Sequence, residues 1–414
     1  MRVLVIGSGG REHALVRALA ADPAVSALHA APGNPGMADQ AELHPVAATD
    51  ERDVIRLARR LSADLVVIGP EAPLVAGVAD ALRLAGFAVF GPDAAAARIE
   101  GSKAFAKEVM AAAGIPTAAA RVATTPAGAL AALDEFGPPY VVKDDALAAG
   151  KGVVVTEDRP AAAAHAAGCA RVVIEEYLDG PEVSLFAVAD GRTAVPLLAA
   201  QDFKRALDGD RGPNTGGMGA YLPLPWAPPG LADEAMETVI RPAIAELARR
   251  GAPYRGLLYA GLALTSKGVR VVEFNARFGD PETQVVLDRL ATPLAGLLHA
   301  SATGDLGPAT ALSWHPGAAV TVVIAAEGYP AAPAAGDPVT IGELPAGTPG
   351  YLLHAGTARD GASLVTAGGR VLNAVGTGPD LAAARAAAYA VAECVRFRGC
   401  WYRHDIAERA SGGS

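Results

Sequence analysis

The first twelve residues, MRVLVIGSGGRE (Met1–Glu12), decide the fold of the N-terminal part of the chain. The run Arg2–Ile6 predicts a buried strand, the glycines that follow predict a tight turn, and a helix is expected from about Arg11. An apolar run that is this short and leads into a glycine turn is typical of a core strand rather than a signal sequence. We therefore expect a cytoplasmic protein.

The same strand–turn–helix pattern repeats up to about residue 93. Strands are expected near Ala27–Ala31, at Asp64–Ile68 and at Phe87–Phe90, with one helix running from Glu71 to Ala85. Short apolar runs that alternate with amphipathic segments indicate a parallel, doubly wound sheet with helices on both faces.

A sheet of this kind raises the possibility of a dinucleotide site. The fingerprint of such a site is G-x-G-x-x-G after the first strand, whereas the segment Gly7–Glu12 has glutamate in place of the third glycine. The fingerprint is broken, but a glycine turn at a helix N-terminus can still bind the phosphate of a substrate through backbone N–H groups.

The composition narrows the classes of partner. The chain has 414 residues, of which 51% are hydrophobic and 19% charged, and its formal net charge is −9. This length predicts two to four packed units. The acidic balance disfavours a nucleic-acid binder, and charges or prolines interrupt each apolar run before about 18 residues accumulate. We expect small-molecule partners, no nucleic acid and no membrane.

Cysteine and histidine give no sign of a metal centre. Cys169, Cys394 and Cys400 form no C-x-x-C pair, and the eight histidines form no H-x-x-x-H or H-x-x-H pair. The spacing therefore predicts neither a disulfide framework nor a histidine-built metal site. Lysine is scarce, yet four of the six lysines lie in glycine-rich or charged motifs, which indicates a polyphosphate site.

The segment Lys143–Val153, KDDALAAGKGV, joins two expected strands, Tyr140–Lys143 and Gly152–Thr156. A loop that ends in Gly-Lys-Gly lets backbone N–H groups approach phosphate oxygens while lysines neutralise them. It is not a Walker A loop, which needs G-x-x-x-x-G-K-[ST] and a following helix. Taken alone, the segment fits a solvated hairpin turn equally well.

A second motif is Val271–Thr283, VVEFNARFGDPET. Strand side chains alternate, so Glu273, Asn275 and Arg277 are expected on one face. A carboxylate, an amide oxygen and a guanidinium in one row are typical of a Mg²⁺ site beside an anion clamp. An ordinary polar strand face is the alternative, and the charged turn at the end of the strand argues against it.

Two further motifs complete the candidate site. The first runs from Gln201-Asp202-Phe203-Lys204-Arg205 to the loop Gly212–Tyr221, whose three close glycines predict a backbone nest for a negative group unless the loop is only a flexible linker. The second is Val172–Glu182, a strand whose exit backbone is suited to an adenine edge and whose Glu182 is suited to ribose hydroxyls. Paired glutamates at a strand end are, taken alone, a weak signal.

Taken in order, these motifs resemble the phosphoribosylamine–glycine ligase family of the ATP-grasp superfamily. The resemblance runs over nearly the whole chain, from Met1 to the segment Trp401–Ile406. The segments that carry it are Gly7–Ala14, Ala31–Asn34, Gly69–Leu74, Glu100–Lys103, Ala148–Gly152, Pro213–Tyr221 and Glu273–Gln284.

The resemblance implies an α/β and α+β multidomain fold in four parts. An N-terminal Rossmann-like substrate domain covers residues 1–99, and the ATP-grasp large subdomain covers 100–115 and 180–312. A small lid covers 116–179, and a β-rich α+β domain covers 313–414. We also expect a helix at about Glu100–Gly114, a long helix near 233–250, a hairpin that turns at Gly368-Gly369 and a closing helix near 380–396.

The resemblance, with the motifs above, assigns roles to individual residues. ATP is expected at Lys103, Lys143, Gly150, Lys151, Gly152, Glu175, Glu176, Leu178 and Glu182. The metal, Mg²⁺ or Mn²⁺, is expected at Glu273 and Asn275. The transferred group and the glycine carboxylate are expected near Arg277, Thr215, Gly216 and Gly217. The substrates glycine and 5-phosphoribosylamine are expected around Gly9, Gly10, Arg11, Asn34, Glu71, Asp202, Lys204 and Asn214.

The sequence departs from the family pattern in three places: the lid loop, the lid helix and the Gln201–Arg205 motif. Asp144 and Ala146 stand where the family loop commonly has alanine and glycine, and the helix between Thr156 and Arg171 is expected to be short. If position 146 needs a positive φ, alanine there costs about 1 kcal/mol. Phe203 stands where histidine is frequent, so we expect no catalytic role for it.

The reaction that the resemblance implies needs no protein nucleophile. Glycine would be phosphorylated by ATP to glycyl phosphate, and phosphoribosylamine would then displace phosphate to form glycinamide ribonucleotide in purine biosynthesis. Positioning and charge neutralisation are the main demands of such a step. Three alternatives stay open: an ATPase of the same architecture that phosphorylates bicarbonate, a nicotinamide-dependent oxidoreductase and a non-catalytic nucleotide sensor.

Overall fold

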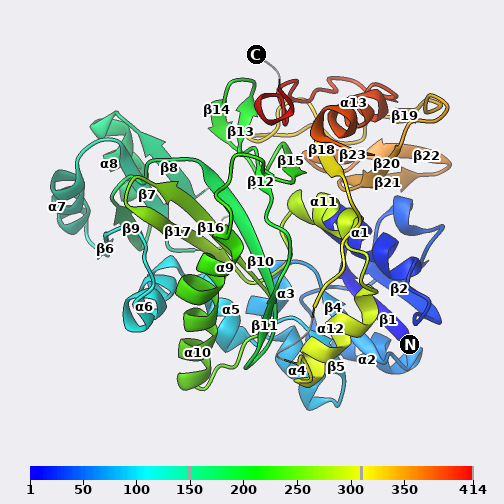
Figure 1. Cartoon of the computed structure of the whole chain (residues 1–414), viewed down its shortest axis with the longest axis horizontal. Coiled ribbons are helices and arrows are strands. Elements are labelled where there is room, and N and C mark those ends of the chain that lie inside the picture. The colour runs from blue at the N-terminus through cyan, green and yellow to red at the C-terminus, as the bar shows by residue number, and fades with distance from the viewer. Residues whose placement is uncertain (147–151, 308–310, 413–414) are drawn as a thin grey trace.

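The first part of the chain folds into a parallel sheet, as the alternating pattern predicts. The computed structural model describes residues 1–146, 152–307 and 311–412, and in it this sheet has the strand order β3-β2-β1-β4-β5 (Figure 1). Both faces of β1 are covered, because Val3 to Ile6 are fully buried. The strands are β1 (Arg2–Gly7), β2 (Ala27–Pro32), β3 (Glu42–Leu43), β4 (Leu65–Ile68) and β5 (Ala88–Phe90).

Helices follow the strands of this sheet. They are α1 (Gly10–Ala20), η1 (Pro35–Met37), α2 (Glu51–Leu61), α3 (Glu71–Val75) and α4 (Val78–Leu84). The prediction of one helix from Glu71 to Ala85 is wrong. Gly77 has a φ of 86°, a left-handed conformation that ends α3 and lets the chain start α4 in a new direction.

Two helices lead out of the N-terminal sheet, α5 (Ala94–Gly101) and α6 (Lys103–Ala113). The prediction of a helix that starts at about Glu100 is corrected, because Ser102 has an extended φ of −142° and separates the two. The Ser102 hydroxyl accepts a hydrogen bond from the Phe105 N–H and so caps α6. Gly114, with a φ of 67°, ends α6.

A small antiparallel sheet with the order β6-β9-β7-β8 lies at one end of the molecule (Figure 1). Its elements are β6 (Ala120–Ala123), α7 (Pro126–Phe136), β7 (Tyr140–Asp144), β8 (Val153–Thr156), α8 (Arg159–Ala167) and β9 (Val172–Glu175). Tyr140 and Val142 pack with residues of α7 and α8, so the alternation of the strand directs Lys143 to the other face. The helix α8 has nine residues, which agrees with the short helix that was expected.

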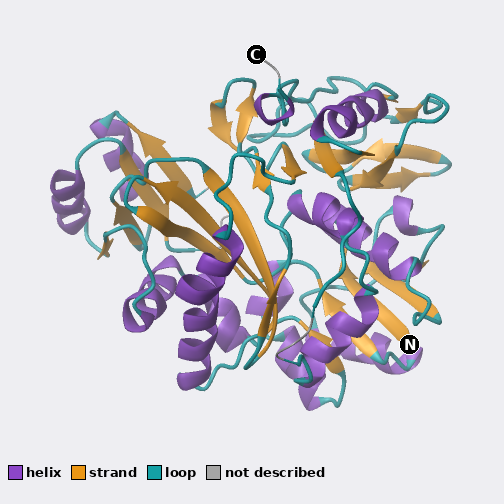
Figure 2. Cartoon of the chain, in the orientation of Figure 1, coloured by secondary structure: helices purple, strands orange, loops and turns teal. Residues whose placement is uncertain are grey.

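The larger antiparallel sheet has the order β11-β10-β16-β17. Figure 2 draws its long strands in orange beside helices in purple. Its strands are β10 (Glu182–Asp190), β11 (Ala194–Pro196), β16 (Arg255–Thr265) and β17 (Gly268–Asn275). The helices in this part of the chain are α9 (Leu231–Ala235), the π-helical turn η2 (Met236–Ile240), α10 (Arg241–Arg249), α11 (Glu282–Arg289) and α12 (Leu294–Thr303). The first three form one long helical segment, whose buried residues pack on one face of the sheet, and buried residues of α12 pack on the other face.

The C-terminal sheet has the order β12-β15-β18-β23-β20 and includes two strands from the middle of the chain. Its strands are β12 (Gln201–Asp202), β15 (Gly219–Leu222), β18 (Ala318–Ala325), β20 (Gly350–His354) and β23 (Arg370–Gly378). The helix α13 (Leu381–Ala392) packs on it. Because β12 and β15 belong to this sheet, the loop between them is fixed against the C-terminal part.

Three strand pairs and a short 3-10 helix complete the fold. The pairs are β13 (Arg205–Leu207) with β14 (Arg211–Asn214), β19 (Thr340–Ile341) with β24 (Val395–Arg396), and β21 (Thr357–Asp360) with β22 (Ser363–Thr366), and the helix is η3 (Arg409–Ser411). The predicted hairpin at Gly368-Gly369 is wrong, because β22 pairs with β21 whereas β23 pairs with β18 and β20.

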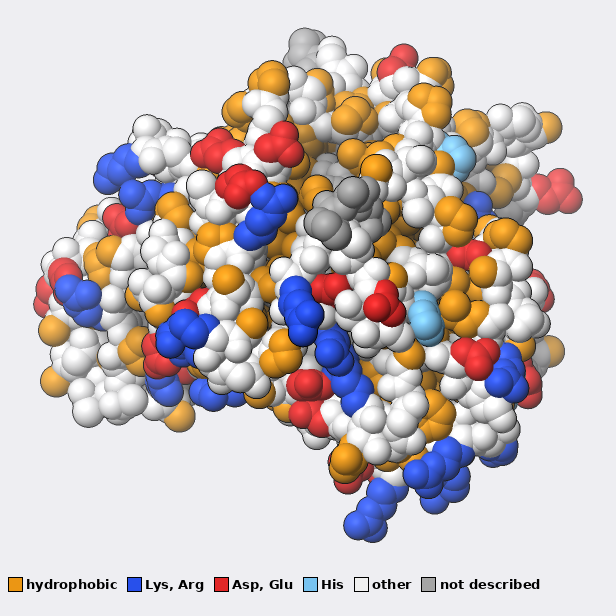
Figure 3. Space-filling view, turned by 60° about the horizontal axis from the view of Figure 1, so that its bottom comes forward, with side chains coloured by type: hydrophobic (Ala, Val, Ile, Leu, Met, Phe, Trp, Pro, Cys, Tyr) orange, Lys and Arg blue, Asp and Glu red, His pale blue; other side chains and the backbone are white. Residues whose placement is uncertain are grey.

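Within the described ranges, every helix is too short or too polar to cross a lipid bilayer. On the face drawn in Figure 3, acidic and basic side chains lie among broad neutral and hydrophobic areas.

Candidate active site

Lys143 connects the small sheet to the larger one. Its buried side chain forms an ion pair with Glu175 on β9 at 2.8 Å, and its ammonium donates to the carbonyl of Val272 on β17 at 2.9 Å. Glu175 also pairs with Lys107 at 3.0 Å. The two lysines and Glu175 thus form a charged group at the junction of the two sheets, where sequence analysis expects the triphosphate.

Four cations act on the carboxyl group of Glu273. Burial raises the pKa of its carboxyl, but Lys204, Lys143, Lys103 and Arg277 lower it, and the net shift is downward. The carboxyl is therefore held in its ionised form, while 37% of the side chain stays exposed. A carboxylate that is ionised and open to solvent is a suitable ligand for a divalent metal.

Lys103 and Lys204 are distant in sequence, and both interact electrostatically with Glu273. The Lys103 ammonium donates to the carbonyl of Ala146, and burial lowers its pKa against the opposing effect of Glu273. Lys204 lies 2.5 Å from the Glu182 carboxylate and 3.9 Å from that of Glu273. The expected ATP residues Lys103 and Glu182 and the expected substrate residue Lys204 are thus brought together.

Asp202 lies beside this group, on β12. Burial and the carboxylates of Glu282, Glu182 and Glu273 raise the pKa of Asp202 to about 7, against the lowering effect of Lys204. The carboxyl groups of Glu182, Asp202 and Glu273 therefore all act on one ammonium, that of Lys204. Such a donor set fits a hard divalent cation, which would take over part of the charge balance.

Arg277 is held by two carboxylates from the N-terminal part. Its guanidinium lies 3.1 Å from Glu100 and 3.3 Å from Glu71, and it donates to the amide oxygen of Asn275 at 3.3 Å. Burial lowers the pKa of Arg277, but the carboxylates of Glu100 and Glu71 raise it by more. The net shift is upward, so the guanidinium stays charged. The residue expected to grip the glycine carboxylate is already engaged by carboxylates of the chain.

The glycine loop expected to bind a negative group has partners for its N–H groups. The Gly216 N–H donates to the hydroxyl of Tyr329 at 2.9 Å, and the Gly217 N–H donates to the hydroxyl of Thr215 at 3.0 Å. The Thr215 hydroxyl in turn donates to the carbonyl of Lys204 at 2.9 Å. In this conformation the loop is internally braced, and its role toward a ligand stays a prediction.

The three motif segments lie side by side. Lys143 contacts Val272, the Asn214 amide donates to the carbonyl of Val153 at 3.5 Å, and Gly217 packs on Pro281. A Cβ on Gly217 would lie 2.4 Å from the Pro281 Cδ, so the close approach requires glycine. The described parts of the three motifs therefore lie close together, at Lys143 with Val272, at Asn214 with Val153 and at Gly217 with Pro281. Gly150 and Lys151 lie outside the described residues, and Gly152 is buried directly before β8.

Glu12 stands at the position of the third glycine of the dinucleotide fingerprint, and its side chain fills the turn. Its carboxylate accepts the Gly9 N–H at 2.6 Å and pairs with Arg11 at 2.5 Å, and both charged side chains are buried. Its side-chain carbons pack so closely that a Cβ on Gly7 or Gly69 would overlap them. The turn is filled by a carboxylate of the chain, which argues against a dinucleotide pyrophosphate there.

The other expected substrate and ATP residues have structural partners. Asn34 donates to the carbonyls of Ser8 and His354 and accepts the Gly36 N–H. A Cβ on Gly10 would lie 2.3 Å from the Asn373 amide, so Gly10 is closely packed. Glu176 accepts the Ala119 N–H at 2.9 Å. Leu178 is half-buried just beyond β9.

Sequence analysis missed several side chains that shape the site. Glu100 and Asp280 lie in motifs that were quoted, so their charge was a usable signal. Arg370 and Tyr329 come from the C-terminal part, and no motif marks them. Arg370 lies 2.9 Å from the Asp280 carboxylate and donates to the Gly216 carbonyl at 2.5 Å.

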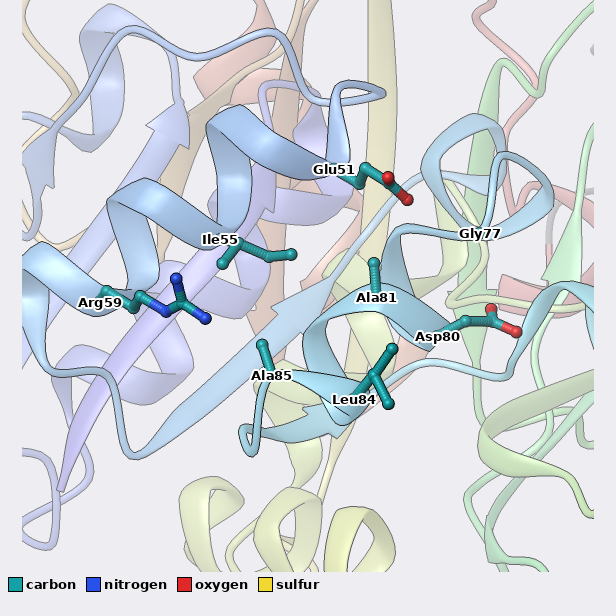
Figure 4. A pocket seen from close by; sticks show the side chains of 8 residues that line it. All are labelled: Glu51, Ile55, Arg59, Gly77, Asp80, Ala81, Leu84 and Ala85. Atoms are coloured by element: carbon teal, nitrogen blue, oxygen red, sulfur yellow. The ribbon is translucent and has the colours of Figure 1, made fainter.

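A hollow of about 610 Å³ lies elsewhere, between α2 and α4 (Figure 4). It is lined by Glu51, Ile55, Arg59, Gly77, Asp80, Ala81, Leu84 and Ala85. None of these residues belongs to the charged group around Glu273, so the hollow is separate from the candidate site.

Solved structures share this arrangement of sheets. The biotin carboxylase domain of a 2-oxoglutarate carboxylase from Hydrogenobacter thermophilus has a TM-score of 0.73 at 18% identity and covers 97% of this chain and 91% of its own. At that identity only the fold is shared. In this fold, lysines and carboxylates meet between a small and a large sheet.

Three family models cover most of the chain. Residues 1–100 match "Phosphoribosylglycinamide synthetase, N domain", residues 101–283 match its "ATP-grasp (A) domain" and residues 319–409 match its "C domain". The chain belongs to the phosphoribosylamine–glycine ligase family.

Individual relatives agree with this family. A phosphoribosylamine–glycine ligase from Streptomyces coelicolor is 63% identical over the whole of both chains, and one from Mycobacterium tuberculosis H37Rv is 57% identical over 100% of this chain and 99% of its own. The crystal structure of the phosphoribosylamine–glycine ligase from Thermotoga maritima has a TM-score of 0.84 at 36% identity and covers 98% of this chain and 100% of its own. The predicted activity, ATP-dependent ligation of glycine to phosphoribosylamine in purine biosynthesis, is confirmed.

Proposed function

We propose that the chain forms glycinamide ribonucleotide through glycyl phosphate, at the place where Lys143, Lys204 and Glu273 meet. A carboxylate oxygen is a poor leaving group, so the glycine carboxylate must first be activated. Its oxygen would attack the γ-phosphorus of ATP and release ADP. The phosphoribosylamine nitrogen would then attack the acyl carbon, lose a proton and expel phosphate.

The four cations that act on Glu273 support this proposal. Phosphoryl transfer spreads negative charge over the transferred group, and fixed cations stabilise that charge without reorganising. Lys103 and Lys143 would contact the ATP phosphates, with Gly150, Lys151 and Gly152 covering them. Glu175–Leu178 and Glu182 would surround the adenosine.

The residues present fit a divalent metal. Glu273 supplies an ionised carboxylate, Asn275 supplies an amide oxygen, and further carboxyl groups lie nearby. Glu273 and Asn275 would hold Mg²⁺ or Mn²⁺, which when bound neutralises charge on the phosphates. We favour Mg²⁺ or Mn²⁺ because all the proposed donors are oxygens.

The remaining assignments concern the two other substrates. The glycine carboxylate and the transferred group would lie at Arg277 and Thr215–Gly217. Arg277 would then have to bind the ligand while it also contacts Glu71 and Glu100. Phosphoribosylamine would lie along the 7–11 turn, through contacts other than the Gly9 N–H, which Glu12 already takes. The other residues proposed for substrates are Asn34, Asp202, Lys204 and Asn214. The proposed location is the cytoplasm, because the reaction consumes ATP.

Replacement of Glu273 by Gln tests the metal assignment. The variant keeps the size of the side chain but removes the charge, so we expect kcat to fall about 10²-fold or more while the chain stays folded. Glu237→Gln on the exposed face of the long helix is the matched control and should be fully active. Unchanged turnover of the Glu273 variant at ordinary Mg²⁺ would refute the assignment.

Isotope transfer tests the intermediate. With glycine labelled with ¹⁸O in its carboxylate, one labelled oxygen should appear in the released phosphate for each turnover, measured by ³¹P NMR. Label in AMP, or no label in phosphate, would rule out glycyl phosphate. Bicarbonate in place of glycine serves as the control and should not stimulate ADP release.

A further inference from the structure

Three metal-binding side chains meet at the edge of the N-terminal sheet. The Nδ1 atom of His29 lies 3.1 Å from Nε2 of His44 and 3.4 Å from a carboxylate oxygen of Glu42. The His44 Nε2 lies 3.8 Å from the other oxygen of Glu42. Each residue therefore offers one ligand atom, and these atoms all lie within 4.8 Å of one another.

The strand register builds this cluster. His29 on β2 is the direct partner of Glu42 on the parallel strand β3, so their side chains lie side by side. His44 comes two positions after Glu42, and strand alternation returns it to the same face. The His44 N–H donates to the carbonyl of Ala30 at 3.0 Å, which extends the pairing past the end of β3. The linear sequence hid the cluster because its ligands lie on two strands.

The spacing matches that of a tetrahedral site. Zn²⁺ binds histidine nitrogen at about 2.0–2.1 Å and carboxylate oxygen at about 2.0–2.2 Å, so ligand atoms at the corners of a tetrahedron lie about 3.3–3.5 Å apart. The His29 Nδ1 atom lies 3.1 Å from His44 Nε2 and 3.4 Å from one Glu42 oxygen, close to that value, and His44 Nε2 lies 3.8 Å from the other oxygen of the same carboxylate. A hydrogen bond between two imidazoles explains the shortest separation but not the approach of the carboxylate to both rings.

Burial also suits a metal ion. His29 and His44 are 9% and 7% exposed, so their rings are held in place, whereas the Glu42 side chain is 67% exposed. Solvent can therefore reach the cluster from the side of Glu42 and supply a fourth ligand. Two imidazoles and one carboxylate favour a transition metal over Mg²⁺, which prefers oxygen ligands.

We propose that His29, Glu42 and His44 bind one Zn²⁺ ion, at a site separate from the one at Glu273. The ion would fasten the two-residue edge strand β3 to β2. The strand β2 leads directly into Gly33 and Asn34, and Asn34 braces the turn through the Ser8 carbonyl. The bound ion would therefore stabilise the N-terminal sheet and the turn proposed for phosphoribosylamine. Figure 1 shows β2 and β17, the strand of Glu273, in different parts of the molecule.

Zinc titration of the full-length, tag-free, metal-stripped protein tests the proposal. The titration is run in excess Mg²⁺, so that oxygen-rich sites are already occupied. We expect one Zn²⁺ to bind per chain, to raise the melting temperature and to be removed by a strong chelator. Co²⁺ added in place of Zn²⁺ should give the intense visible absorption of a four-coordinate site.

Variants locate the ion. Glu42→Gln and His44→Gln should each weaken Zn²⁺ binding at least tenfold and reduce the gain in melting temperature. Since Glu42 is exposed, its variant is expected to fold normally. His315→Gln changes an exposed histidine outside the cluster and should bind like the unmodified chain. Absence of zinc uptake, or equal affinity in the Glu42 and His44 variants, would overturn the proposal and leave only a hydrogen bond between two imidazoles.

Discussion

The side chain of Glu12 decides what the first glycine turn can bind. In a dinucleotide-binding sheet this turn offers free N–H groups to a pyrophosphate. Here the Glu12 carboxylate takes the Gly9 N–H and is balanced by Arg11. One substitution in a common motif thus replaces a ligand anion by an anion of the chain, which argues against the oxidoreductase alternative.

His13 gives a pH-dependent contribution to stability. Burial and the neighbouring His354 lower the pKa of His13 to about 3, so the folded chain keeps it neutral while the unfolded chain takes up a proton below about pH 6.5. The unfolded state then binds more protons, and stability falls as the pH drops from about 6.5 toward 3. At pH 5 the loss from this residue is about 2 kcal/mol.

His13→Gln keeps an acceptor for the His354 N–H but removes this titration. The free energy of unfolding, measured in urea at pH 8 and pH 5, should therefore fall by about 2 kcal/mol less in the variant than in the unmodified chain. The exposed His315→Gln should leave the difference unchanged. Equal acid sensitivity of the His13 variant and the unmodified chain would contradict this account.

Among the elements, the loop between β14 and β15 depends on glycine for its position. Gly217 has a φ of 107° and lies against Pro281, and the loop is held further by Tyr329 and Thr215. A wider separation of this loop from the turn at residues 279–283 would move the proposed reaction groups apart.

Gly217→Ala should therefore cost both stability and activity. The positive φ costs an alanine about 1–2 kcal/mol, and the overlap with Pro281 adds about 1–3 kcal/mol. We also expect kcat to fall at least tenfold. Gly230→Ala is the control, because Gly230 has a φ of 82° but no atom within 4 Å of its Cβ position. It should show the cost of the positive φ alone, with full activity, whereas equal effects of the two changes would exclude the steric explanation.

At the scale of the whole molecule, two arginines join parts that are distant in sequence. Arg277 at the end of β17 pairs with Glu71 and Glu100 from the N-terminal part. Arg370 on β23 pairs with Asp280 and donates to the carbonyl of Gly216. The C-terminal sheet thereby helps to position the loop and turn of the proposed active site.

Arg370→Lys tests this coupling. Lysine keeps the charge but loses the planar fork that reaches several acceptors at once. Because small misplacements of reacting groups are costly, we expect kcat/KM to fall about 10–100-fold while the chain stays folded. Arg359→Lys on the exposed strand β21 is the matched control and should be fully active. Normal kcat/KM of the Arg370 variant would show that the C-terminal sheet does not position the site.

The sequence by itself determined the parallel N-terminal sheet, the strand β17 and the family. These follow from local patterns, since the run Arg2–Ile6 and the alternation around Glu273 are legible over a few residues. Local patterns also gave wrong predictions where one backbone angle decides, as at Gly77 and Ser102. The hairpin at Gly368-Gly369 was wrong because the strands on its two sides pair with other strands.

Only the tertiary structure decided which groups meet. The pairing of Arg277 with Glu100, the bracing of the glycine loop by Tyr329 and Arg370, and the cluster of His29, Glu42 and His44 each join separate strands or loops. Such contacts depend on strand order and register, which no short stretch of sequence specifies, because each partner alone looks like an ordinary polar residue.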